Sequence, residues 1–133
     1  MLIETQDRYA PGSTDTTGYT EQLSQFYCDI LVDVVAETFV SGDTFFPTEK
    51  TFRPMLMKKP FIAMASRNHM AYLQQMGFRT FHDYWDESYD GVSSGERYMM
   101  ILQLINSLAS KTIDELESMY SDMQDILDHN ANL

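Results

Sequence analysis

The sequence predicts a small three-layer α/β domain with a parallel sheet of at least three strands and two helices at its C-terminal end. Two runs, 30–36 and 61–65, are continuously apolar, as strands buried on both faces are. Segments with helical signals alternate with these runs, which is typical of parallel strands joined by right-handed crossovers. The chain of 133 residues, 44% of them hydrophobic, is long enough for one domain with its own core. We therefore expect half of a doubly wound fold.

The elements follow in order along the chain. Residues 1–29 are expected to form an arm and a short helix, because 6–20 are rich in Gly, Pro, Ser, Thr and Asp. The domain proper, 30–133, begins with the strand 30–36. Thr48 then offers an N-cap for a helix over 49–57.

The second strand, 61–65, precedes a helix that Ser66 caps and that ends at Met76, with Gly77 as its stop signal. A third, shorter strand is expected over 78–81, and an acidic, aromatic loop over 82–93. Two helices close the chain.

The first of these two helices begins at Ser93 or Ser94 and ends near Ser110. Its side chains are apolar on nearly all sides, so we expect it to be buried. The last helix begins with a capping box at Thr112 and carries one apolar stripe from Ile113 to Leu127.

The net charge of −11 argues against nucleic acid or anionic lipid as a main partner, because both require a basic surface. No apolar run approaches the roughly 18 residues that a membrane span needs. A single cysteine and a start without an apolar leader favour a reducing, cytoplasmic location. All six bases between residues 50 and 82 lie in a stretch without acids. This basic segment either forms an anion site or pairs with the acidic flanks.

The segment 45–54 is the most informative for function. It places Thr48, Glu49 and Lys50 on the first turn of a helix, where free amides and the helix dipole attract phosphate. Lys50 adds a charge for the same phosphate oxygens, Glu49 can accept hydrogen bonds from a ribose diol, and Arg53 can support the phosphate end. The alternative is ordinary helix capping with a solvated lysine.

The acidic loop over 82–90 is the second candidate. Trp85 or Tyr89 could stack on a base or a sugar, and Asp86 and Glu87 lie beside them. The carboxylates of the loop could also hold Mg²⁺, but we do not predict a metal site. The alternative is a solvated loop that Trp85 attaches to the core.

Four blocks of the sequence resemble a glycosyltransferase-like domain of phage and marine bacterial proteins: T-E-K-T-F-R-P, K-K-P-F-I-A-M-A-S, Y-L-Q-Q-M-G-F-R-T-F and W-D-E-S-Y-D. The T-E-K portion is also similar to the donor-binding half of fucosyltransferases with two Rossmann-like domains (the GT-B type). The resemblance covers about residues 30–92. It implies that Glu49 holds the ribose and Lys50 the diphosphate of a GDP- or UDP-linked sugar, with no other cofactor.

The resemblance also implies a second domain that binds the acceptor and supplies the catalytic base. The chain has no room for such a domain. The resemblance further implies an arginine before the T-E-K motif that lies near the donor, but the only arginine there is Arg8, in the arm, and we do not assign it this role. We therefore expect a donor-side half, whether a fragment, one part of a split gene, or a domain that lost catalysis. Hexosyl or fucosyl transfer would need a separate domain or subunit, and no catalytic residue is assigned.

A function of another class is also consistent with the sequence. The apolar helix over 94–110 and the stripe on the last helix could form the interface of a homodimer. The chain would then be a non-catalytic assembly domain. The two functions are compatible if two copies together build a two-domain cleft.

Overall fold

The computed structural model of the chain describes residues 22, 24–38, 40 and 42–133. The arm expected over 6–20 lies outside these residues, whereas the short helix before residue 30 is present over 24–28. The elements that follow are β1 (Asp33–Ala36), α2 (Glu49–Leu56), β2 (Phe61–Met64), α3 (His69–Gln75), the 3₁₀ helix η2 (Ser88–Gly91), α4 (Ser94–Ala109), α5 (Ile113–Asp122) and α6 (Gln124–Ala131).

The two strands pair in parallel, as the sequence predicts, with Asp33 opposite Phe61 and Ala36 opposite Met64. Both strands are shorter than the apolar runs that contain them. The side chains of Phe61, Ile62 and Ala63 are almost fully buried, so β2 is covered on both faces. The architecture is therefore mixed α/β around a short parallel pair.

The prediction of a third strand over 78–81 was wrong, because this segment pairs with no strand in the described part of the chain. Side chains bind its backbone instead. The Asn130 Oδ1 accepts a hydrogen bond from the Arg79 amide, and Asn130 Nδ2 donates to the Arg79 carbonyl, both at 2.8 Å. Glu87 accepts from the Phe81 amide at 3.2 Å. These bonds satisfy polar backbone groups that a neighbouring strand would otherwise have to pair.

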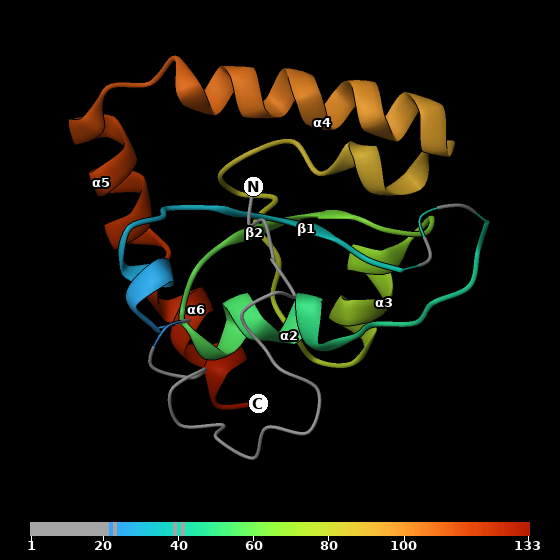
Figure 1. The fold of residues 1–133 in the computed structure, drawn as a ribbon, viewed down its shortest axis with the longest axis horizontal. Coiled ribbons are helices and arrows are strands. Elements are labelled where there is room, and N and C mark those ends of the chain that lie inside the picture. The colour runs from blue at the N-terminus through green and yellow to red at the C-terminus, as the bar shows by residue number, and fades with distance from the viewer. Residues whose placement is uncertain (1–21, 23, 39, 41) are drawn as a thin grey trace.

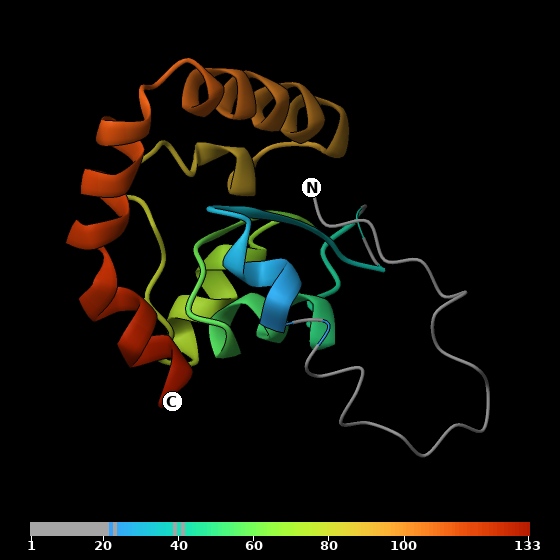
Figure 2. The same ribbon diagram turned by 60° about the vertical axis from the view of Figure 1, so that its left-hand side comes forward.

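The elements lie on both sides of the strand pair. Figure 1 shows α2 and α3 on one side and α4 with η2 on the other. In Figure 2, α5 and α6 run along one flank of the molecule, from the level of α4 to the level of α2. Contacts between α4 and β2, and between α2 and α6, close the core around the strand pair.

The C-terminal region differs from the expectation of two helices, because the last one is divided at Met123 into α5 and α6. Met123 is completely buried. Ile113, expected on the buried stripe, is 74% exposed. The division therefore lets α6 turn its apolar side to the core independently of α5.

The helix α4 begins at Ser94 with Ser93 as its N-cap, as expected, but it is not buried on all sides. Only Ile101 and Leu108 of its apolar side chains are buried, and Tyr98 and Met99 are each 55% exposed. One face of α4 thus packs on the core and the other faces outward. None of the described helices is both long and apolar enough to cross a membrane.

Candidate functional site

The first turn of α2 lies at the carboxyl end of β1, where parallel α/β sheets bind ligands. Glu37, which directly follows β1 and is 5% exposed, occupies the amides of this turn. Its carboxylate accepts hydrogen bonds from the amides of Thr48 (3.2 Å) and Thr51 (3.0 Å). The hydroxyls of Thr48 and Thr51 also donate to it. A carboxylate of the chain itself therefore caps α2 at the place where a phosphate was expected.

Asp90 caps α3 in the same manner. Its two carboxylate oxygens accept from the amides of Met70 (2.9 Å) and Ala71 (3.1 Å). The N-termini of α2 and α3 thus each bind an internal carboxylate, which complements the positive end of the helix dipole. These amides are not available to an external anion while the carboxylates stay in place.

His69 extends the cluster around Glu37. Its Nε2 lies 3.1 Å from the Thr51 hydroxyl, and its ring is buried beside that of Phe45. Burial lowers the pKa of His69, so the imidazole is neutral at pH 7. Burial alone would raise the pKa of Glu37, but the hydrogen bonds from Thr51 and Thr48 lower it below its usual value. The cluster therefore holds an ionised carboxylate and a neutral imidazole.

The structure places Thr48, Glu49 and Lys50 together at the carboxyl end of β1. The Lys50 ammonium lies 3.4 Å from the Thr38 hydroxyl, and no described residue forms an ion pair with it. Glu49 is exposed beside it. The Thr48 hydroxyl is already used by Glu37 and by the Lys50 amide.

Arg53 lies toward the other end of β1. Burial raises the pKa of Asp33, the first residue of the strand, and the positive charge of Arg53 opposes part of this rise. Tyr27 donates a hydrogen bond of 2.6 Å to the same carboxylate. Arg53 also follows Lys50 by three positions on α2, so the phosphate role expected of Arg53 stays a prediction.

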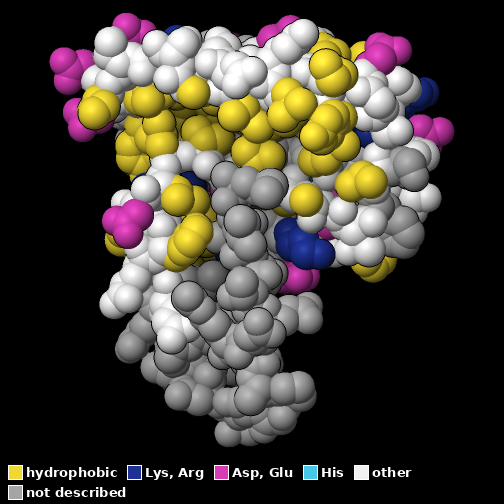
Figure 3. All heavy atoms as spheres, turned by 45° about the horizontal axis from the view of Figure 1, so that its top comes forward, with side chains coloured by type: hydrophobic (Ala, Val, Ile, Leu, Met, Phe, Trp, Pro, Cys, Tyr) yellow, Lys and Arg dark blue, Asp and Glu magenta, His cyan; other side chains and the backbone are white. Residues whose placement is uncertain are grey.

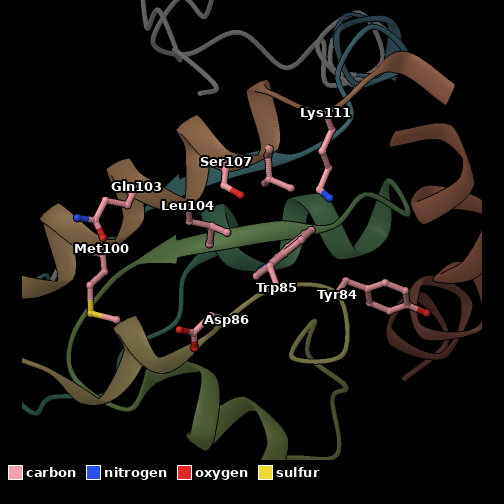
Figure 4. A pocket seen from close by; sticks show the side chains of 9 residues that line it. Tyr84, Trp85, Asp86, Met100, Gln103, Leu104, Ser107 and Lys111 are labelled. Carbon is pink, nitrogen blue, oxygen red and sulfur yellow. The ribbon is translucent and has the colours of Figure 1, made fainter. Parts of the chain in front are cut away.

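The four residues expected to contact a sugar divide into two pairs. Trp85 and Asp86 line a hollow of about 320 Å³ between α4 and the segment 84–86 (Figure 4). Glu87 instead binds the Phe81 amide, and burial raises its pKa. Tyr89 is 1% exposed, its hydroxyl lies 3.4 Å from the Ala63 amide, and burial raises its pKa well above 10.0. Only Trp85 and Asp86 are thus placed to touch a ligand in the hollow.

The hollow and Lys50 lie on different sides of the strand pair. The hollow is on the α4 side, whereas Lys50 belongs to α2 on the opposite side (Figures 1 and 4). The two groups of candidate residues therefore form two separate sites.

Sequence reasoning missed Glu37 and the capping role of Asp90, and it missed the residues that line the hollow on and just after α4. The latter are Gln103, Ser107 and Lys111. Glu37 had one weak signal, because it follows a predicted buried strand directly. A carboxylate there lies close to the next helix in a crossover. The residues of the hollow on and just after α4 had no sequence signal, because polar side chains are ordinary at the surface positions of an apolar helix.

Among the described residues, no group of three or more His, Cys, Asp or Glu side chains is arranged to hold a metal ion. Comparisons of the chain with protein-family models, with curated proteins and with solved structures found no match.

Proposed function

We propose that the chain is the donor-side half of a glycosyltransferase-like protein and binds the nucleoside diphosphate of a sugar donor at the carboxyl end of β1. The observation that supports this proposal most is the environment of the Lys50 side chain. Its ammonium lies at this end of a parallel β–α–β unit and has no carboxylate partner in the described part of the chain. A diphosphate would supply the missing negative charge.

The geometry changes the expected mode of binding. Glu37 and Asp90 bind the helix amides, so the diphosphate would contact the Lys50 side chain rather than an amide cradle. Glu49, exposed on the same turn, would accept hydrogen bonds from the ribose. The resemblance of the T-E-K block to fucosyltransferases agrees with these two roles.

The test measures thermal unfolding with GDP, UDP and CMP and with their sugar conjugates, in the wild type and in Lys50→Ala. A ligand at about 100 times its Kd stabilises the native state by about 2.7 kcal/mol. We expect a shift with one nucleotide that is lost in Lys50→Ala and kept in Lys58→Ala. Lys58 is a matched control, because it is a half-exposed lysine paired with Asp128. A well-folded wild type that none of these ligands stabilises would contradict the proposal.

A second candidate is a non-catalytic assembly domain, in which α4 pairs with α4 of a second copy. The observation that favours it is the outward face of α4, where Tyr98, Met99 and Leu102 are exposed. Figure 3 shows hydrophobic side chains gathered across this face of the molecule. Residues 98–110 contain no charge in a chain of net charge −11, so two copies would repel each other least here.

Light scattering across a concentration series tests this candidate. We expect a dimer in the wild type and a monomer in Leu102→Glu, because a buried unpaired charge weakens an interface strongly. Ser121→Glu, which adds the same charge on the exposed side of α5, should leave the dimer intact. A monomeric wild type at all concentrations would exclude this candidate.

A further inference from the structure

We propose that the hollow between α4 and the segment 84–86 is a binding site for a neutral monosaccharide ring. It lies on the opposite side of the strand pair from Lys50, so the inference does not depend on the nucleotide site. Its volume of about 320 Å³ is within the range of small-ligand sites. The lining side chains are Tyr84, Trp85, Asp86, Met100, Gln103, Leu104, Ser107, Leu108 and Lys111.

The apolar part of the hollow suits the face of a pyranose ring. Trp85 packs on Phe81 in the core and borders the hollow with the small part of its side chain that is exposed (7%), and Leu104 and Leu108 of α4 line the hollow beside it. Figure 4 shows the Trp85 ring lying between α4 and the Asp86 side of the hollow. A pyranose has a face of C–H groups that can pack on such a mixed aliphatic and aromatic lining and exclude water from it.

The polar part offers both donors and acceptors for hydroxyl groups. Gln103 and Ser107 project from α4, one turn apart, toward the hollow (Figure 4). Asp86 is an acceptor, because its carboxylate has an oxygen left beside the Oδ1 that accepts from the Ser88 amide at 2.9 Å, and hydrogen bonds from Ser88 lower its pKa. Lys111 is a donor at the other end, and no described residue forms an ion pair with it. A ring that carries several hydroxyls can use both kinds of partner at once.

The charges around the hollow favour a neutral ligand over an anionic one. The carboxylate of Asp86 and the ammonium of Lys111 lie at opposite ends of it (Figure 4). Lys111 also borders a shallower hollow that Asp114, Glu115 and Asp122 line. A sugar phosphate or uronate would meet these carboxylates, whereas an uncharged sugar would not.

The test uses the fluorescence of Trp85, which is the only tryptophan of the chain and therefore reports directly on the hollow. Glucose, galactose, mannose, fucose and N-acetylglucosamine are titrated separately, with glucuronate and glucose 6-phosphate as the anionic comparison. We expect a saturable change in emission with at least one neutral sugar, and weaker binding of its anionic counterpart. Gln103→Ala and Ser107→Ala should each raise the Kd about threefold to tenfold, because each removes a hydrogen bond.

The matched control is Asn106→Ala, an exposed position on α4 that does not line the hollow, and it should leave the Kd unchanged. All three positions are exposed helix residues, where alanine preserves the fold. No saturable change with any of the neutral sugars would overturn the proposal. Binding that Gln103→Ala and Ser107→Ala leave intact would also overturn it. The nucleotide test with Lys50→Ala has a separate ligand and readout, so either proposal can fail alone.

Discussion

Glu37 stabilises α2 from outside the helix, through two amides and two hydroxyls that all donate to one buried carboxylate. Glu37→Gln would point an amide NH₂ group at some of these donors. We expect the free energy of unfolding to fall by about 2–4 kcal/mol, because buried donors lose their acceptor. Urea unfolding at pH 7 measures the change. Glu49→Gln, an exposed glutamate on the same turn, should change it by less than about 0.5 kcal/mol. Equal effects of the two substitutions would contradict this account.

Because His69 is buried, we expect the folded protein to lose stability on mild acidification. The pKa of His69 in the folded protein is lowered by burial, so below its usual value of 6.5 the unfolded chain binds more protons than the folded one. Stability is then full above pH 6.5 and decreases as the pH falls below it. The lowered pKa of Glu37 acts in the same direction, but only from about its usual value of 4.5 downward.

The measurement compares the free energy of unfolding at pH 7.5 and pH 5.5 in the wild type and in His69→Gln. The variant lacks the titrating group, so its stability should decrease less between the two pH values. A parallel decrease in both proteins would show that His69 is not the group responsible.

At the scale of elements, Arg97 attaches α4 to the rest of the fold. Its side chain is buried and donates to the carbonyl oxygens of Val40 (3.0 Å), Ala65 (2.7 Å), Tyr89 (3.2 Å) and Val92 (2.6 Å). These carbonyls come from the segment after β1, the end of β2 and both ends of the turn around η2. One guanidinium thus joins three backbone segments, and two of them, at Val40 and Ala65, are distant from Arg97 in the sequence.

Arg97→Met should lower the free energy of unfolding by at least 3 kcal/mol, because four carbonyls lose their donors. Arg97→Lys should recover only part of the loss, since an ammonium has three donors and no planar fork. Arg67→Met is the control, because Arg67 is about half exposed and its nearest described carboxylate is 4.0 Å away. If Arg67→Met costs as much as Arg97→Met, the role assigned to Arg97 is wrong.

The elements that the sequence predicted best are those with local signals. Thr48, Ser93 and Thr112 each cap a helix within three residues of themselves, and these three caps are confirmed. The cap expected at Ser66 was wrong, because α3 begins only at His69 and the Ser66 hydroxyl donates to the Thr44 carbonyl instead. Gly77, with φ of 101°, ends α3 as expected. Arg97 and Asp90 act across longer distances in the chain, so no local pattern indicates them.

At the scale of the whole molecule, the parallel pairing of the two apolar runs could be predicted, but the number of strands could not. Segment 78–81 has the composition of a strand, and Asn130, about fifty residues away, binds its backbone instead. The sequence also could not show that Lys50 and Trp85 lie on different sides of the strand pair. That separation depends on how α4 folds back over β2.

The excess of acidic residues predicts that added salt stabilises the protein. The chain has 20 acidic and 9 basic residues, so repulsion among carboxylates opposes the compact state. Salt at about 0.5 M shortens the Debye length to a few ångströms and screens this repulsion. We expect the Tm to rise between low and high NaCl concentration, measured by differential scanning calorimetry. Substituting the exposed Glu117 and Asp125 by lysine should reduce this rise, and a Tm that falls with NaCl would contradict the prediction.

The capping of α2 by Glu37 also has a consequence for the order of folding. Eight residues with an internal Pro54 are too short to form a stable helix alone in water. The cap comes from Glu37 at the end of β1, so Glu37 must reach α2 before this helix gains its strongest hydrogen bonds. A peptide of residues 45–60 should therefore show little helical circular dichroism. In the intact chain, Glu37→Gln should slow refolding if α2 docks on β1 in the transition state.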